Sequence, residues 1–249
     1  GPMEPLKLAE DLWLIDLAVY LPEPRTLVIA DLHLGYEEAL RREGVALPPG
    51  HLRKVEARLE RILSRLGTVH RLIINGDLKH RFAPLSHYEE QEALAFLEFL
   101  APRFAELILI RGNHDRNIEG LLLGGPHLEV QEALVEGRLL IIHGDREPGR
   151  AELSGVEAIL IGHDHPAVGL RSRTGRLEVY KAFLLGEYHG RRLLVQPSFN
   201  LLVRGSDLAR ERALSTLLAE ERLGGFEVYP VSDEGEIYPL GPLGSLPRP

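Results

Sequence analysis

Short apolar runs alternate with amphipathic stretches along the first half of the chain. The runs at residues 27–30, 72–74 and 107–110 are rich in Leu, Ile and Val and are bounded by polar residues, so they predict buried strands. Between these runs, apolar residues recur at helical spacing over residues 51–66 and 87–101, which predicts two amphipathic helices. The first half is therefore expected to alternate strands and helices.

The second half of the chain predicts mainly strands. Its apolar runs are short, and little helical periodicity separates them. The predicted strands lie around Val135 and at residues 139–142, 158–161, 177–180, 193–195, 226–230 and 237–240. One short helix is expected within residues 208–223, and the Pro- and Gly-rich end at 241–249 is expected to fray. No linker divides the sequence, so residues 1–249 are interpreted as one domain.

Polar residues that can bind metal follow five of these apolar runs. In open α/β sheets, ligands bind at the carboxyl ends of strands, so the five clusters predict one shared site. A single strand-ending Asp is more often a turn or cap residue, but five clusters together favour the shared site. The clusters are Asp31-Leu32-His33, Gly76-Asp77, Gly112-Asn113-His114-Asp115, His143-Gly144-Asp145 and Gly162-His163-Asp164-His165.

Composition restricts the chemistry further. The 249 residues include no Cys, which excludes disulfides and thiolate ligands, and oxygen and imidazole donors suit Mn, Fe, Zn or Mg. The net charge of −8 argues against a broad nucleic-acid-binding surface but leaves a local basic groove open. The longest apolar runs fall far below the ~18 residues of a membrane span, and no signal peptide is visible. A cytoplasmic protein without membrane association is expected, and nothing indicates its oligomeric state.

Taken together, the five clusters resemble the signature motifs of the calcineurin-like metallophosphoesterases, in their order and in their separations. They span residues 31–165. More narrowly, residues 31–37, 76–80 and 197–200 resemble the SbcD-related branch, which includes the DNA-ligase-associated phosphoesterases. This resemblance implies an α/β fold, a four-layer αββα sandwich in which two mixed β-sheets are flanked by helices.

The resemblance also implies two divalent ions, with Mn²⁺ as the first choice and Fe, Zn or Mg as alternatives. One ion would be held by Asp31, His33, Asp77 and His165. The second ion would share Asp77 and would be held by Asn113, His143 and His163.

The same resemblance assigns the chemistry. A hydroxide that bridges the two ions would attack phosphorus in line. His114 would stabilise the developing charge and help to protonate the leaving oxygen, and Asp115 would accept a hydrogen bond from His114.

Two positions depart from the family pattern. His80 stands where the family usually has an Asp, and Asp145 stands where the fourth motif often has a second His. Neither position is expected to be a ligand, so the departures concern substrate contacts. The candidate substrate-binding residues are Tyr36, His80 and Arg204. Core packing is an equal alternative for Tyr36, and a solvated surface position is favoured for Arg204.

The predicted function is a dinuclear metal-dependent phosphoesterase, most simply a phosphodiesterase, with a phosphate ester as its substrate. One alternative is a DNA or RNA nuclease acting in DNA repair, although only 84 residues follow His165, which leaves little room for a DNA-holding cap. A second alternative is a non-catalytic scaffold on the same fold. The presence of His114 and of every expected ligand argues against the scaffold.

Overall fold

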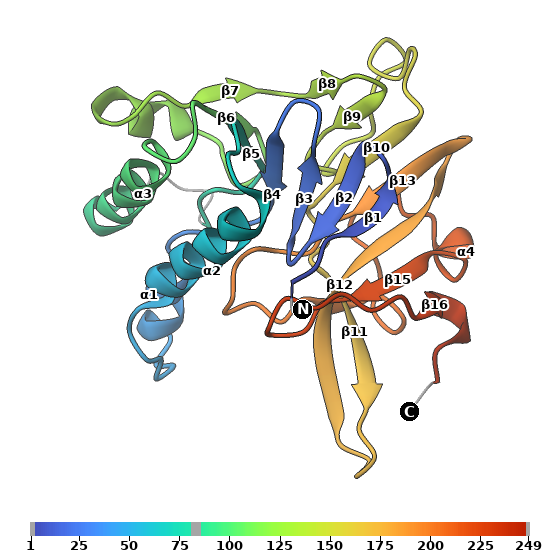
Figure 1. Cartoon of the computed structure of the whole chain (residues 1–249). Coiled ribbons are helices and arrows are strands. Elements are labelled where there is room, and N and C mark those ends of the chain that lie inside the picture. Colours follow the sequence, from blue (N-terminus) through green and yellow to red (C-terminus); the bar gives the residue numbers. More distant parts are fainter. Residues whose placement is uncertain (1–2, 81–85, 248–249) are drawn as a thin grey trace.

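Two mixed β-sheets face each other in the computed structural model, which describes residues 3–80 and 86–247 (Figure 1). The first sheet begins as an antiparallel meander and continues with parallel strands from β4 onward. Its strands, in spatial order, are β1 (Leu6–Ala9), β2 (Leu12–Ile15), β3 (Ala18–Leu21), β4 (Thr26–Ile29), β5 (Arg71–Asn75), β6 (Glu106–Ile110) and β7 (Glu129–Gln131).

The second sheet contains the remaining strands. Its order is β14-β11-β12-β13-β10-β9-β8, and β15 pairs with both β12 and β16. The strands are β8 (Leu134–Glu136), β9 (Leu139–Ile141), β10 (Ala158–Ile161), β11 (Pro166–Arg171), β12 (Leu177–Tyr188), β13 (Arg191–Val195), β14 (Ser206–Asp207), β15 (Glu227–Pro230) and β16 (Gly241–Pro242). Because β9, β10 and β13 run parallel, the carboxyl ends of β9 and β10 lie at one edge.

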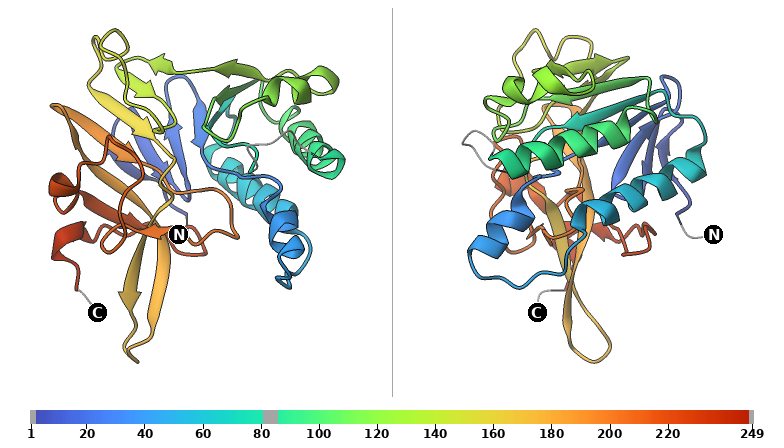
Figure 2. Two further views of the ribbon diagram at one scale, coloured as in Figure 1. Left: turned by 180° about the vertical axis from the view of Figure 1, so that it is seen from behind. Right: turned by 90° about the vertical axis from the view of Figure 1, so that its left-hand side faces the viewer.

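Two helices, α2 (His51–Leu66) and α3 (His87–Leu100), cover the outer face of the first sheet, and the short helix α1 (Tyr36–Arg42) precedes them (Figure 2). The predicted helix at residues 51–66 is confirmed, and α3 ends one residue before its predicted end. Ser86 and Glu89 form a capping box that starts α3. Within residues 3–80 and 86–247, no helix has the length and apolar character needed to cross a membrane.

A continuous apolar core fills the space between the sheets and beneath the helices. Val28, Ile73 and Leu109 from the first sheet belong to the same buried cluster as Leu160 and Phe183 from the second. The predicted sandwich of two mixed sheets is therefore confirmed.

The outer face of the second sheet has little helix. In the described part of the chain this layer contains only α4 (Glu220–Leu223), so most of the helix expected within residues 208–223 is absent. Side-chain oxygens accept hydrogen bonds from backbone N–H groups that a longer helix would use within itself. Asp164 accepts hydrogen bonds from the N–H groups of Leu214 and Ser215, and the Ser215 hydroxyl accepts one from the N–H of Leu217.

The C-terminal expectations also need correction. The strand predicted at residues 237–240 is reduced to a bridge between Ile237 and Val231, and strand pairing moves on to β16. Within the end expected to fray, residues 243–245 form a 3₁₀ turn, η2 (Leu243–Ser245), while residues 248–249 lie outside the described residues. Leu243 is buried against the second sheet, and this burial holds the segment in place.

One hairpin projects from the body of the molecule. Strand β11 pairs with the first half of β12, from Ala167 opposite Lys181 to Arg171 opposite Leu177, while the second half of β12 pairs with β13 and β15. Figure 1 shows the tip of this hairpin extending beyond both sheets. Since β11 begins directly after His165, the hairpin starts at one of the predicted ligands.

Candidate metal centre

The predicted ligands meet where strands of both sheets end. Asp31 and Asp77 follow β4 and β5, while His143 and the His163–His165 stretch follow β9 and β10. Two groups of three residues place their ligand atoms within 4.8 Å of one another. The first group is Asp31, His33 and His165, and the second is Asp77, His143 and His163.

The two groups adjoin each other. The Nε2 atom of His33 lies 3.0 Å from the Nε2 of His165 and 3.7 Å from the Oδ2 of Asp77. In the other direction, the Nε2 of His143 lies 3.1 Å from the Oδ2 of Asp77 and 3.8 Å from the Oδ1 of Asp31. The two carboxylates therefore lie between the histidines of both groups.

Two buried oxygens at this place have no hydrogen-bond partner among the described residues: Oδ1 of Asp31 and Oδ1 of Asn113. Buried polar atoms in native proteins almost always have a partner, because leaving one unpaired costs about 1–3 kcal/mol. A bound cation would satisfy both oxygens. The donor set is carboxylate, amide oxygen and imidazole, so these residues fit a divalent metal.

The backbone at the site is unusual. Asp31, His33, Asp77, His163 and His165 all have positive φ, between 46° and 74°, in the left-handed region that non-glycine residues seldom adopt. Such conformations cost roughly 1–3 kcal/mol each and persist only where the surrounding structure enforces them. Their concentration at five of the predicted ligands points to a functional constraint on these loops.

Two motif glycines leave room for the ligands. A Cβ atom on Gly76 would lie 2.0 Å from Nδ1 of His143, and one on Gly112 would lie 2.3 Å from Oδ1 of Asp77. Gly76 also has a φ of 84°, which favours glycine. Any side chain at either position would displace a ligand.

The ligands are strongly coupled electrostatically. Burial lowers the pKa of His143, but the hydrogen bond and charge of Asp77, with the charge of Asp31, outweigh it and raise this pKa to about 10. For Asp31, burial raises the pKa, yet the charges of His165, His143 and His33 shift it well below its usual range. The metal-free site thus stabilises a proton on His143, which a divalent cation would displace, whereas burial lowers the pKa of His33 to about 3 and also lowers the pKa of His163.

Asp115 differs from its predicted role. Its carboxylate is fully buried and accepts hydrogen bonds from the N–H groups of Gly112 and Asp77 (both 2.8 Å) and of Leu78 (2.9 Å). Among the described contacts, its partners are main-chain groups and not the ring of His114. Asp115 follows β6, which pairs with β5, so its short side chain reaches the turn after β5. Asp115 therefore fixes the turn that carries Asp77.

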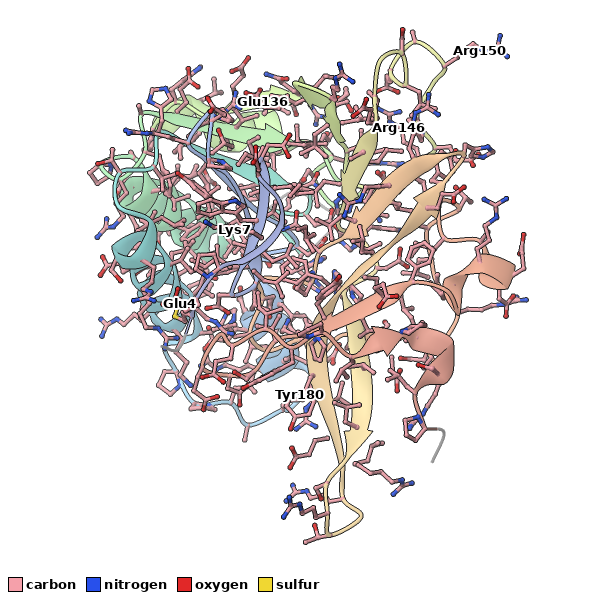
Figure 3. All side chains as sticks on the ribbon, turned by 45° about the vertical axis from the view of Figure 1, so that its right-hand side comes forward. Glu4, Lys7, Glu136, Arg146, Arg150 and Tyr180 are labelled. Atoms are coloured by element: carbon pink, nitrogen blue, oxygen red, sulfur yellow. The ribbon has the colours of Figure 1, made fainter. Side chains whose placement is uncertain are left out.

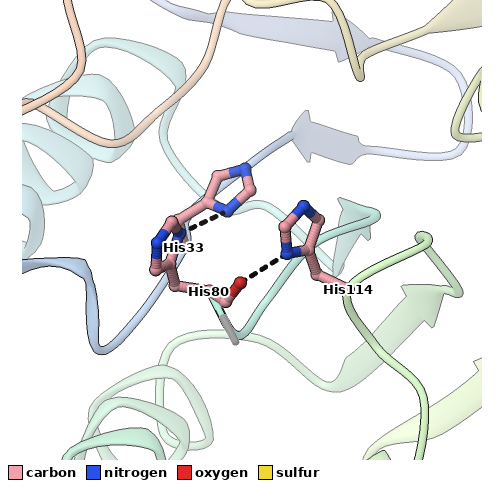
Figure 4. Close-up of side chains that lie close together, drawn as sticks. All are labelled: His33, His80 and His114. Carbon is pink, nitrogen blue, oxygen red and sulfur yellow. Dashed lines mark hydrogen bonds between the residues drawn. The ribbon is translucent and has the colours of Figure 1, made fainter. Parts of the chain in front are cut away.

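His114 is oriented by a different residue. Its Nδ1 hydrogen-bonds the carbonyl oxygen of His80, and its ring lies 5.0 Å from the ring of His33 (Figure 4). His33, His80 and His114 form a third group of nearby ligand atoms. The ring of Tyr36 lies 4.7 Å from that of His80, and Nδ1 of His80 lies 3.4 Å from Nδ1 of His33, so Tyr36 and His80 border the candidate ligands.

Arg204 is placed elsewhere. It is exposed and lines a cavity of about 510 Å³ at the base of the β11–β12 hairpin, together with Arg176, Tyr180 and Lys181. None of the predicted metal ligands lines this cavity. Direct contact between Arg204 and a phosphate at the metal site is therefore not supported.

A buried network that the motifs did not indicate supports the Asp31–His33 turn. Lys181 donates hydrogen bonds to the carbonyl oxygens of Ser198 (2.9 Å) and Asn200 (2.7 Å). Ser198 in turn donates to the carbonyl of Asp31, and Asn200 donates to that of Leu32. In the sequence, the family resemblance included residues 197–200, which contain Ser198 and Asn200, but it did not include Lys181.

Lys181 is expected to make stability depend on pH. Burial, with a contribution from the charge of Arg58, lowers its pKa to about 7, against about 10.4 in the unfolded chain. Between these values the unfolded chain binds more protons, so the free energy of unfolding should rise with pH. Lys181→Met should flatten this rise by on the order of 1–3 kcal/mol between pH 7 and 9.5. Urea unfolding of the metal-free protein measures it.

The matched control for that experiment is Lys54→Met, which removes an exposed lysine from α2. This variant should keep the pH dependence of the original protein. Equal slopes for Lys181→Met and Lys54→Met would contradict the prediction.

Comparison with known proteins places this geometry in a family. The family model for calcineurin-like phosphoesterases matches residues 24–205. The chain resembles the crystal structure of Pseudomonas putida nuclease MPE, with 23% identity, a TM-score of 0.62, and coverage of 95% of this chain and 99% of that one. It also resembles the Escherichia coli phosphoesterase Yfce, with 15% identity, a TM-score of 0.41, and coverage of 87% and 98%. A search of the curated proteins gives no match. The chain belongs to the calcineurin-like phosphoesterase family.

Proposed function

We propose that this protein is a phosphodiesterase that uses two divalent ions, with Mn²⁺ as the preferred metal. The residues that would hold the ions are Asp31, His33, Asp77, Asn113, His143, His163 and His165. The observation that carries the proposal is the pair of adjoining groups of ligand atoms. Oδ1 of Asp31, in the first group, and Oδ1 of Asn113, beside His114, are buried without a hydrogen-bond partner among the described residues.

When bound, divalent ions would supply Lewis acidity toward the phosphoryl oxygens and would lower the pKa of a water nucleophile. In the reaction, water adds to phosphorus, one P–O bond breaks, and the departing alcohol takes up a proton. Asp31 and Asp77 provide negative charge that would retain the ions. His163 and His165 are half-buried, so the site stays accessible to a substrate.

His114 is suited to deliver the proton to the departing oxygen. The hydrogen bond between its Nδ1 and the carbonyl oxygen of His80 holds the ring in one orientation, and Nε2 is the nitrogen that would exchange the proton. Its main-chain N–H donates to Oδ1 of Asp77, at 2.9 Å, which ties the position of the acid to the metal ligand. His80 is thus a positioning residue: its carbonyl oxygen orients the ring of His114.

Replacing His114 by alanine is expected to lower kcat for a Mn²⁺-loaded diester hydrolysis by about 10²–10⁴-fold, as is typical for loss of a general acid. The deficit should be larger for a diester with a poor leaving group than for bis(p-nitrophenyl) phosphate, whose phenolate needs little protonation. Metal content should stay close to that of the original protein.

The matched control is His127→Ala, which removes an exposed histidine outside the ligand groups. An equal deficit for good and poor leaving groups would show that His114 does not act as the acid. If the original protein hydrolyses no diester faster than the Asp77→Ala variant, the proposed function is wrong. Parallel assays with a monoester decide between diesterase and monoesterase activity.

A nuclease is the second candidate, and the exposed arginines of the β11–β12 hairpin favour it. The non-catalytic scaffold has less support, because six of the seven predicted ligands form two adjoining groups and the N–H of His114 donates to Asp77. The proposal also includes the SbcD-related assignment, one domain over residues 1–249 and a cytoplasmic location. These three expectations rest on the sequence.

A further inference from the structure

Four exposed arginines gather on the β11–β12 hairpin and at its base: Arg171, Arg173, Arg176 and Arg204. In the described part of the chain, none of the four forms an ion pair, whereas arginines elsewhere, such as Arg41 and Arg146, are paired with glutamates. In a chain with a net charge of −8, these four arginines gather positive charge in one region, which also contains the carboxylates of Glu178 and Asp233.

This surface is joined to the metal centre. Strand β11 leaves directly from His165, and the carbonyl oxygen of His165 accepts a hydrogen bond of 2.8 Å from the N–H of Ser206. Arg204 precedes this contact by two residues. At its other end the hairpin carries Arg173 in the tip, between β11 and β12. The arginines of the hairpin thus stand on a segment that starts at a ligand of the candidate metal site.

A cavity at the base of the hairpin combines charge with an aromatic ring. Arg176, Arg204 and Tyr180 all line this space of about 510 Å³. Figure 3 shows Tyr180 at the base of the hairpin, beside the body of the molecule. The nearby carboxylate of Glu178 accepts a hydrogen bond from the Tyr180 hydroxyl, so it is engaged within the hairpin. Positive grooves interleaved with aromatic rings are typical of surfaces that bind single-stranded nucleic acid.

We propose that the β11–β12 hairpin and Arg204 form a surface that holds a single-stranded nucleic acid and leads it to the metal centre. This inference rests on the proposed phosphodiesterase function, since such a strand is a chain of phosphodiesters. The guanidinium group suits phosphate because it donates paired hydrogen bonds. The six residues of β11 span about 20 Å, enough to contact several successive phosphates.

The test compares the original protein with a double variant, Arg173→Ala/Arg176→Ala. Arg171 is kept because it donates to the carbonyl of Gly175 and supports the turn at the tip. The matched control, Arg61→Ala/Arg150→Ala, removes the same charge from exposed arginines elsewhere, and Arg150 lies at the opposite end of the molecule from the hairpin (Figure 3). Binding of a fluorescent oligothymidylate is measured by anisotropy, with metal withheld to prevent cleavage.

The double variant should bind the strand about 10-fold or more weakly. The slope of log affinity against log salt should become shallower by about 1.4, as expected for two lost single-strand phosphate contacts. With Mn²⁺, cleavage of the oligonucleotide should fall in parallel, while hydrolysis of bis(p-nitrophenyl) phosphate stays unchanged. The control variant should behave like the original protein in all three assays.

Equal strand binding by the double variant and the control would overturn the inference. Tighter binding of duplex than of single strand, with the same dependence on the arginines, would overturn the assignment to single strands. Failure of the original protein to hydrolyse the small diester would contradict the proposed function instead. The anisotropy result does not depend on catalysis, so the two failures are distinguishable.

Discussion

The Asp77→Asn variant is expected to lose diester hydrolysis by about 10³-fold or more, equivalent to about 4 kcal/mol in the activation free energy. Asp77 is buried and lies between the two ligand groups, within 3.1 Å of Nε2 of His143 and 3.7 Å of Nε2 of His33. An amide keeps the volume of the side chain but removes the charge that would hold both ions. Mn²⁺ content after loading should therefore fall together with the rate.

A matched control is Asp11→Asn, which makes the same chemical change at an exposed position. Hydrolysis with Mn²⁺ and elemental analysis of the loaded proteins are the two measurements. If Asp77→Asn kept both its metal content and its rate, a role for Asp77 between two ions would be untenable.

The Gly76→Ala variant is expected to lose both stability and metal binding. The added methyl group would lie 2.0 Å from Nδ1 of His143, and the φ of 84° is unfavourable for alanine. The ring of His143 has little freedom to yield, because it is buried and its Nδ1 hydrogen-bonds the carbonyl of Asn75. Conformational strain and overpacking together should cost about 2–5 kcal/mol. Thermal unfolding and Mn²⁺ titration measure the two losses.

Gly190→Ala separates the two causes, since Gly190 has a φ of 79° but open space around it. This variant should show a loss from backbone strain alone and should bind Mn²⁺ normally. Equal stability losses in the two variants would mean that the contact with His143 contributes nothing.

The grouping of the candidate ligands could be predicted from the sequence, because they follow short apolar strands and parallel strands bring their ends to one edge. The role of Asp115 could not, since its main-chain partners come from the turn after β5 and no spacing reports them. The same limit applies to Lys181, which lies far along the chain from the Asp31 turn that it supports through Ser198.

Elements with a weak local sequence pattern also could not be predicted from the sequence. The four-residue strands β1 to β3 are too short to show a clear period, and they are identified only by their pairing. Residues 208–223 have apolar spacing suited to a helix, yet the carboxylate of Asp164 takes their amide groups. In both places, tertiary contacts decide the local structure.

The candidate ligands come from both halves of the sandwich, with Asp31 and Asp77 on the first sheet and His143, His163 and His165 on the second. Ions held there would act as a cross-link between two layers that otherwise meet mainly through apolar side chains. Binding to the folded state alone stabilises it by RT ln(1 + [L]/Kd), so metal supply would set the resistance of this protein to unfolding as well as its rate. Loss of metal would then weaken the contact between the two sheets at the place where catalysis would occur.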